Sequence, residues 1–221
     1  MLIYSRLRPF ALAMVFLTAV STQSSNASEP LIIGTGSKGG VYFPTGRAIC
    51  RTLEEYEKKQ GREFTCQQRT SLGSVANLKA LQTNKIQLGI VQSDAHYHAF
   101  KGIRKFKSGA MHELRSLFSL HAETFTVLAR AGSNIRKLEH LQGKRVNVGK
   151  KGSGPRETFI ELMNTLGWKS SKVAGFTQFS PDEQASALCD GRTDVITFVV
   201  GHPANMIRKA SKRCNLRGCT R

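Results

Sequence analysis

The sequence predicts an α/β fold in which short buried strands alternate with amphipathic helices. Apolar runs such as Leu31–Ile33 and Leu88–Gln92 have the length of buried strands, and stretches with helical spacing follow them. This alternation is typical of mostly parallel sheets that are covered by helices. A chain of 221 residues can bury a substantial core, in one large domain or in two small ones.

The chain is strongly basic, with 33 Lys and Arg against 15 Asp and Glu and a formal net charge of +18. Such a charge favours anionic partners, which include small carboxylates, membrane surfaces and nucleic acids. The basic residues are dispersed, apart from the run Lys101–Lys107 and the C-terminal end, and no DNA- or RNA-binding signature is present. We therefore expect no nucleic-acid partner.

Residues 1–27 have the pattern of a cleaved signal peptide. Arg6 and Arg8 precede the apolar run Phe10–Val20, and Ser25–Ala27 offers small residues for cleavage. The apolar run is shorter than the ~20 residues that a membrane span needs. The segment carries two Arg and no acid, so its removal lowers the net charge from +18 to +16. We expect a soluble, exported mature protein.

The cysteines are expected to form disulfides, because pairing is the default in an oxidising compartment. None belongs to a CxxC or to a cluster with metal-ligand spacing, so no metal site is predicted. Cys50 lies in the first predicted helix and Cys66 in the strand that follows, which makes a local bridge easy. We predict the pairs Cys50–Cys66 and Cys189–Cys214, which leave Cys219 unpaired.

Both halves of the chain repeat a unit in which a Gly- and Ser-rich loop joins the end of a strand to the start of a helix. The predicted strands cover residues 31–33, 64–68, 88–92, 114–120, 125–130, 146–149 and 194–200. The predicted helices begin near Pro44, at Ser74 as N-cap, and near Ala95, Glu157 and Ser180. Helix N-termini carry free N–H groups and the positive end of the helix dipole. Two such loops that face each other across a cleft would form an anion site.

The loop Gly34–Gly40 has the G-x-G-x-x-G spacing of a dinucleotide-binding turn, but the rest of that fingerprint is missing. An acid near the end of the second strand would be needed to hold the ribose, and residues 67–70 contain none. A P-loop is excluded because Lys38 is followed by Gly39 and not by Ser or Thr. A turn that needs glycine only for its backbone is the remaining alternative. No cofactor is predicted.

No catalytic arrangement stands out. His96 and His98 are two residues apart, so on a helix they point to different sides and cannot share a metal ion. Asp94 could take part in acid–base chemistry beside them, or it could satisfy N–H groups at a helix start. Neither a nucleophile elbow nor a catalytic cysteine signature is present. We expect that the protein is not an enzyme.

A specific pattern of ordered segments covers nearly all of the exported chain. The segments are IGTGSKGGVYFPTGRAIC (33–50), SLGSVANLKAL (71–81), LGIVQSDAHYHAFKG (88–102), GKRVNVGKKGSGPRETFIELMNTLGW (143–168), SPDEQASALCDG (180–191) and FVVGHPANMI (198–207). In this order they resemble the TAXI family of extracytoplasmic solute receptors, which serve tripartite ATP-independent periplasmic (TRAP) transporters.

This resemblance implies a type II periplasmic binding protein fold, with two α/β lobes, a hinge of crossing strands and a small anionic ligand in the cleft. The implied lobes are residues 28–122 and 123–210. The protein would be a periplasmic monomer that closes about its hinge on a small carboxylate or amino acid, such as glutamate, and passes it to TRAP membrane subunits.

The resemblance also implies a set of ligand-binding residues. The matching positions are Gly36, Ser37, Gly39, Val41, Ser71, Ser74, Gln92, Ser93, Asp94, Ser153, Gly154, Arg156, Gly201 and His202. Backbone amides and hydroxyls would hold a carboxylate, and Arg156 would add a charge-assisted bond. Gln92 and Asp94 would recognise an amino or hydroxyl group. The alternative is that Asp94 only caps a helix and Arg156 only faces solvent.

The C-terminus departs from the family, whose members continue with elements that return to the first lobe. Residues 211–221 form a basic tail without acids, which is typical of a truncated or frame-shifted product. We therefore expect an incomplete first lobe with uncovered apolar surface. The alternatives left open are a non-functional remnant, a basic exported interaction protein and an enzyme on the same bilobal fold.

Overall fold

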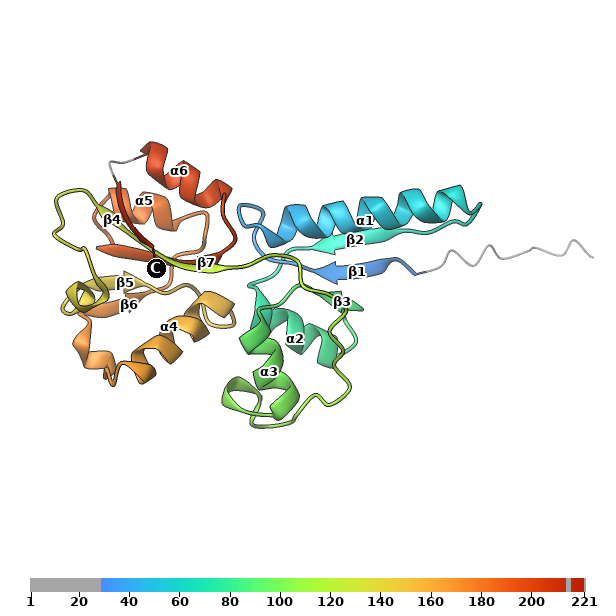
Figure 1. The fold of residues 1–221 in the computed structure, drawn as a ribbon, viewed down its shortest axis with the longest axis horizontal. Helices are drawn as coiled ribbons and strands as arrows, with labels where there is room; N and C mark the ends of the chain where they lie inside the picture. The colour runs from blue at the N-terminus through green and yellow to red at the C-terminus, as the bar shows by residue number, and fades with distance from the viewer. Residues whose placement is uncertain (1–28, 214–215, 221) are drawn as a thin grey trace, which may run out of the picture.

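The computed structural model describes residues 29–213 and 216–220, which form two α/β lobes joined by an extended segment (Figure 1). The predicted signal peptide at 1–27 lies outside the described residues. Within the described part of the chain, no helix combines the length and the apolar character that a bilayer crossing requires.

Lobe 1 is a three-stranded parallel sheet with helices on both faces. Its strands lie in the order β2-β1-β3, and α1 covers one face while α2 and α3 cover the other (Figure 1). The elements are β1 (Leu31–Gly34), α1 (Tyr42–Lys59), β2 (Cys66–Arg69), α2 (Ser74–Gln82), β3 (Leu88–Gly89), α3 (Ser93–Lys101) and the 3₁₀ turn η1 (Arg104–Phe106).

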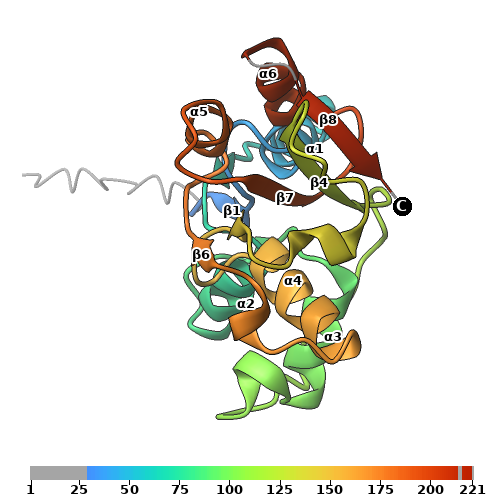
Figure 2. The ribbon, with the colours of Figure 1, turned by 90° about the vertical axis from the view of Figure 1, so that its left-hand side faces the viewer.

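Lobe 2 is a five-stranded mixed sheet in the order β6-β5-β7-β4-β8. Its elements are β4 (Thr124–Arg130), η2 (Leu138–Leu141), β5 (Arg145–Asn147), α4 (Gly154–Thr165), η3 (Ser170–Lys172), β6 (Gly175–Thr177), α5 (Gln184–Cys189), β7 (Val195–Val200), α6 (Asn205–Arg213) and β8 (Leu216–Thr220). β4 runs antiparallel to both of its neighbours, β7 and β8 (Figure 2). The predicted tail at 211–221 therefore supplies the end of α6 and an edge strand.

The core of lobe 2 follows the two-residue period of its strands. Val127 and Ala129 of β4 pack on one face with Phe159 of α4, whereas Leu128 packs on the other face with Leu188 of α5 and Ala210 of α6. Successive strand residues point to opposite faces of a sheet, so a strand with helices on both sides must be apolar throughout. This explains the apolar run Val127–Ala129 within β4.

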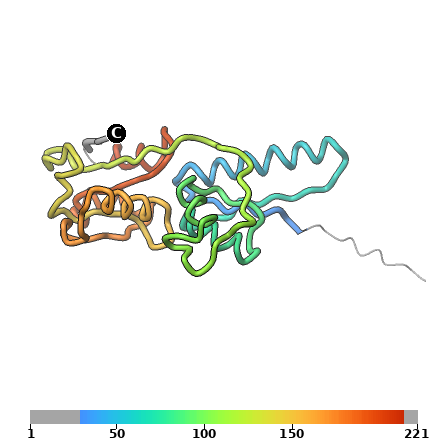
Figure 3. The backbone as a smooth tube through the Cα atoms, turned by 60° about the horizontal axis from the view of Figure 1, so that its bottom comes forward, coloured from blue at the N-terminus to red at the C-terminus, as the bar shows by residue number. Residues whose placement is uncertain are grey.

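Most of the predicted elements are confirmed, but one predicted strand is wrong and two predicted helix starts are shifted. The predicted strand at 114–120 is wrong: no described strand pairs with it, and Leu117 and Phe118 are 66% and 63% exposed. Figure 3 shows the chain running along one edge of the molecule here, from lobe 1 towards β4. The N-cap of α2 is Gly73 and not Ser74, and α5 begins four residues after Ser180.

The predicted Cys50–Cys66 disulfide is confirmed and joins α1 to β2, with 5.1 Å between the two Cα atoms. Both cysteines are buried in the cluster that contains Ile33 and Ile90. Cys189 is also disulfide-bonded, and Cys214, its predicted partner, lies outside the described residues.

Replacing Cys50 and Cys66 together by Ser should destabilise lobe 1. The bridge closes a loop with a sequence separation of 16, and a loop of this size contributes about 3 kcal/mol by restricting the unfolded chain. Urea denaturation followed by circular dichroism measures the change. An unfolding midpoint equal to that of the wild type would contradict the prediction.

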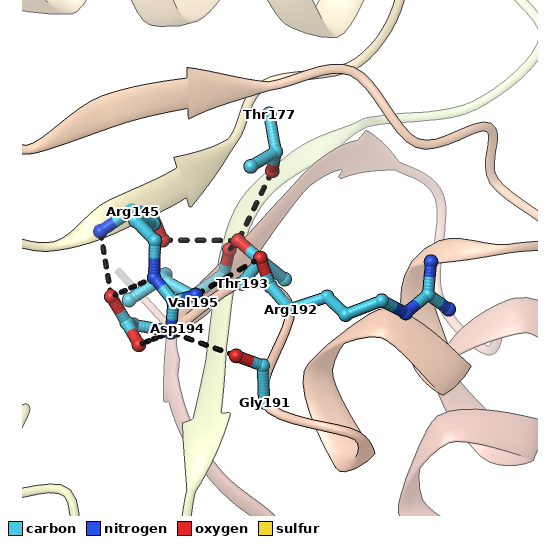
Figure 4. Close-up of polar contacts among 7 residues, drawn as sticks. All are labelled: Arg145, Thr177, Gly191, Arg192, Thr193, Asp194 and Val195. Carbon is cyan, nitrogen blue, oxygen red and sulfur yellow. Dashed lines mark hydrogen bonds and ion pairs between the residues drawn. The ribbon is translucent and has the colours of Figure 1, made fainter.

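A cluster of polar contacts fastens β5 to the start of β7 (Figure 4). The guanidinium of Arg145 donates to Asp194 Oδ1 at 2.6 Å, and the Arg145 backbone N–H donates to Asp194 Oδ2 at 2.8 Å. Thr193 adds a hydrogen bond from its hydroxyl to the Arg145 carbonyl at 3.0 Å. The hydrogen bond from the Arg145 side chain holds the pKa of Asp194 below its ordinary value of 3.8.

The stabilisation by Asp194 should depend on pH. Because its pKa is lower in the folded state, its contribution is fully present above pH 3.8 and is lost as pH falls through the lowered value. The difference in unfolding free energy between the wild type and Asp194→Asn should therefore shrink below about pH 3.8. Urea denaturation between pH 2 and 7 tests this, and a difference that does not change with pH would contradict it.

Candidate functional site

The carboxyl ends of parallel strands from both lobes point into the same cleft. β1 and β2 lead into the loops at 35–41 and 70–73, and β5 and β6 lead into the loops at 148–153 and 178–183. Ligands of open α/β sheets bind outside the carboxyl ends of the strands. The topology therefore places the polar loops of the two lobes opposite each other.

A cavity of about 190 Å³ lies between these loops. This volume suits a small molecule rather than a drug-sized ligand. The predicted site residues that line it are Gly36, Ser37, Val41, Ser71, Ser74, Gln92 and Ser153. The further lining residues are Gly40, Tyr42, Leu72, Gly73, Glu123, Gly149, Lys150, Pro155, Phe179, Ser180, Pro181, Gln184, Thr197, Phe198, Val199, Val200 and Met206.

Several predicted residues lie outside this cavity. Asp94 and Gly154 line a neighbouring crevice between η1 and α4. Asp94 Oδ1 accepts a hydrogen bond from the Ala95 N–H at 2.7 Å, which agrees with the alternative role as a helix-start acceptor. Ser93 is exposed. Of this turn, only Gln92 lines the cavity.

The other outlying residues support the loops or the crossing between the lobes. Gly39 is buried, and a Cβ atom there would lie 2.8 Å from Asp182 Oδ1. Arg156 Nη1 donates to the Gly149 carbonyl at 3.4 Å. Gly201 is buried against His121, and His202 Nε2 lies 2.8 Å from Thr126 Oγ1.

Three helices begin at the cavity without a side-chain cap. The N-cap residues of α1, α2 and α4 are Val41, Gly73 and Ser153, and none of them makes a side-chain hydrogen bond to its helix. The first turns of α1 and α2 also contain no acidic residue. Uncapped N–H groups and the positive ends of the helix dipoles attract anions. The cavity can therefore hold a carboxylate through backbone donors.

A buried amide side chain holds the loops of lobe 1 in this arrangement. Asn77 Nδ2 donates to the carbonyl of Thr35 at 2.7 Å and to the carbonyl of Ile90 at 2.8 Å, which ties the ends of β1 and β3 together. The hydroxyl of Ser71 donates to the same Thr35 carbonyl at 2.8 Å. Ser71 lines the cavity, but its hydroxyl proton is used by the loop.

Asn147 does the same in lobe 2. Its Nδ2 donates to Gln184 Oε1 at 2.8 Å, and its Oδ1 accepts from the Phe179 N–H at 2.8 Å. Asn147 is fully buried. These bonds tie the loop after β6 to the end of β5, so that both lobes use a central Asn for the same purpose.

The lobes are in contact around the cavity. The N–H of Ala76 in α2 donates to the Gly152 carbonyl at 3.2 Å, and Gln92 Nε2 donates to Thr158 Oγ1 at 3.2 Å. Farther out, Arg104 forms an ion pair of 2.7 Å with Glu161. The structure is thus a closed arrangement of the two lobes.

Sequence reasoning missed Tyr42 and Glu123, which lie on opposite sides of the cavity. Within the described residues, the hydrogen bond between their side chains is the only one that joins α1 to the segment before β4. Tyr42 Oη donates to Glu123 Oε2 at 3.0 Å. Burial raises the pKa of Glu123, and burial together with the nearby Glu123 charge raises the pKa of Tyr42 well above its ordinary value. The sequence feature that could have indicated this site is Glu123, the single acidic residue in the crossover 121–124. No group of side chains suited to a metal ion occurs among the described residues.

Residues 33–219 match the model of the NMT1-like family. The chain belongs to the NMT1-like family. The predicted two-lobe α/β fold is confirmed by likeness to solved structures, all at low sequence identity. This NMT1-like chain is similar to the periplasmic aliphatic sulphonate binding protein SsuA from Escherichia coli, with 20% identity and a TM-score of 0.52 over 86% of the chain.

Two further structures are similar to this NMT1-like protein. One is the GluR0 ligand-binding core from Nostoc punctiforme in complex with L-glutamate, with 19% identity, a TM-score of 0.54 and coverage of 86% of this chain and 78% of that one. The other is the ligand-binding component of an ABC-type import system from Staphylococcus aureus, with 14% identity, a TM-score of 0.56 and coverage of 87% of this chain and 60% of that one. The chain likewise spans 60% of the length of SsuA. All three are described as binding proteins or ligand-binding components.

Replacing Asn77 by Leu should destabilise the protein by about 1 to 3 kcal/mol, because the Ile90 carbonyl loses the Asn77 donor and the Thr35 carbonyl keeps only the Ser71 hydroxyl. Urea denaturation measures the loss. Asn164→Leu is the matched control, since Asn164 is exposed on α4. Equal stability of the Asn77 variant and the control would contradict the structural role of this amide.

Proposed function

We propose that the protein is a periplasmic solute receptor that captures a small carboxylate or amino acid in the cleft between its lobes and delivers it to a transporter. The finer part of the proposal is that the transporter is of the TRAP type and that the receptor belongs to the TAXI group. The order of the motifs from residues 33–50 to 198–207 supports that assignment.

One observation carries the proposal: uncapped N-termini of helices from both lobes line a single small cavity. A carboxylate bound there would accept hydrogen bonds from lobe 1 and lobe 2 at once. Lys150 also lines the cavity and adds a positive charge. An anion would therefore stabilise the closed arrangement, which is how a binding protein couples ligand capture to closure.

The solved neighbours support the ligand class and the setting. SsuA is described as a periplasmic binding protein for sulphonates, and the GluR0 core was solved with L-glutamate, so both ligands carry an anionic group. The signal-peptide pattern of residues 1–27 agrees with a periplasmic location. We propose no cofactor and a monomeric receptor.

Isothermal titration calorimetry of the mature full chain tests the function. The panel holds glutamate, glutamine, other amino acids, dicarboxylates and alkanesulfonates. At least one anionic or zwitterionic member should bind with a dissociation constant in the micromolar range or below, and it should raise the melting temperature. If no member bound or stabilised the protein, the proposal would be wrong.

A negative charge at the mouth of the cavity should weaken anion binding. Leu72 lines the cavity, is 52% exposed, and reaches across to the Gly152 loop of lobe 2. Leu72→Glu should therefore reduce the affinity for the bound anion about tenfold by charge repulsion, with little effect on folding. Leu117→Glu, on an exposed residue outside the cavity, is the control. Equal affinities of the two variants would contradict the placement of the site.

A further inference from the structure

The carboxylate of Glu123 lines the same cavity as the anion-attracting helix N-termini. Glu123 is the last residue before β4, at the point where the chain enters lobe 2. Its hydrogen bond from Tyr42 connects it to the start of α1 in lobe 1. Glu123 therefore lies between the lobes, where a bound solute would contact both.

No Lys or Arg side chain forms an ion pair with this carboxylate in the described part of the chain, although the nearby His121 attracts it electrostatically. The ion pairs there involve other acids, and the polar contact of Glu123 is the hydroxyl of Tyr42. A carboxylate has about four acceptor positions, so one hydrogen bond leaves most of its capacity unused. Burial already disfavours its charged form. A partly buried charge of this kind is costly unless a donor or a cation completes it.

A simple carboxylate ligand would not complete this site. Lys150 and the helix N-termini attract its negative group, but Glu123 would gain no further donor from such a ligand and would repel the anion. A ligand that carries both a carboxylate and an ammonium group satisfies both parts of the cavity. Its ammonium offers three donors, and Glu123 offers the matching acceptors.

We propose that Glu123 binds the ammonium group of the ligand, held in position by Tyr42, and that the natural ligand is therefore an amino acid rather than a plain carboxylate or sulfonate. This inference rests on the proposed function and makes it more specific. Gln92 also lines the cavity, and its amide donates to Thr158 Oγ1 at 3.2 Å.

Calorimetry with matched ligand pairs tests the proposal on the mature full chain. Each pair consists of an L-amino acid and the acid without its amino group: glutamate and glutarate, alanine and propionate, leucine and 4-methylpentanoate. The wild type should bind an amino acid at least tenfold more tightly than its partner acid. Glu123→Gln should lose at least tenfold for the amino acid and less than threefold for the partner acid.

Two variants accompany this comparison. Glu139→Gln, on an exposed residue of η2, is the matched control and should keep the wild-type preference. Tyr42→Phe removes the hydroxyl but retains the carboxylate, so it should keep a reduced preference. Melting temperatures without ligand show whether each variant is folded. If Glu123→Gln did not fold, the proposal would be judged by two results: the preference of the wild type for amino acids over the partner acids, and the reduction of that preference in Tyr42→Phe.

The outcomes separate the two claims. If the wild type bound the partner acids or an alkanesulfonate as tightly as the amino acids, the inference would be overturned while the proposed function stood. An equal loss for both members of a pair in Glu123→Gln would mean that Glu123 only supports the fold, and this would also overturn the inference. If the wild type bound no member of any pair, both claims would fail together.

Discussion

The buried amide of Asn77 is the interaction on which the cleft of this protein depends. Parallel strands end in backbone carbonyls that need donors, and Asn77 supplies them to Thr35 and Ile90 without using any N–H group of the loops. Other loop amides of lobe 1 are engaged within the loops: the Gly40 N–H donates to the Ser37 carbonyl at 3.0 Å, and the Gly73 N–H donates to Ser71 Oγ at 2.9 Å. Asn147 holds the loop of lobe 2 by a different pattern, because it accepts from the Phe179 N–H and donates to the Gln184 side chain. Each lobe thus uses one buried Asn side chain to hold its polar loop in place.

Groups of opposite preference line the same cavity. Helix starts and Lys150 favour a negative group, whereas Glu123, at the crossing between the lobes, favours a positive one. Tyr42 links this acid to lobe 1. Closure of the lobes and recognition of both ends of a ligand would then be the same event, which explains why a hinge segment carries a binding residue.

The fold could be predicted from the sequence because it rests on local patterns. The strand at 31–33 and the helix after Ser74 follow from apolar spacing and from a loop residue at the helix start, and both lie within a few residues of the observed elements. The strand at 114–120 could not be judged in this way, because apolar spacing does not reveal whether a partner strand lies beside it. Leu117 and Phe118 are exposed, and no described strand pairs with this segment.

The glycine- and serine-rich loops of the sequence allowed much of the cavity lining to be predicted. Tyr42 and Glu123 could not be predicted in this way, because they are 81 residues apart in the sequence and meet only in the fold.

Hydrogen–deuterium exchange with a bound amino acid at saturation tests the central claim most directly. Slower exchange in both the 36–42 and 150–156 loops is predicted, because ligand binding and closure would engage the amides of both lobes. Protection confined to one lobe, or absent from both loops, would contradict a ligand held between them.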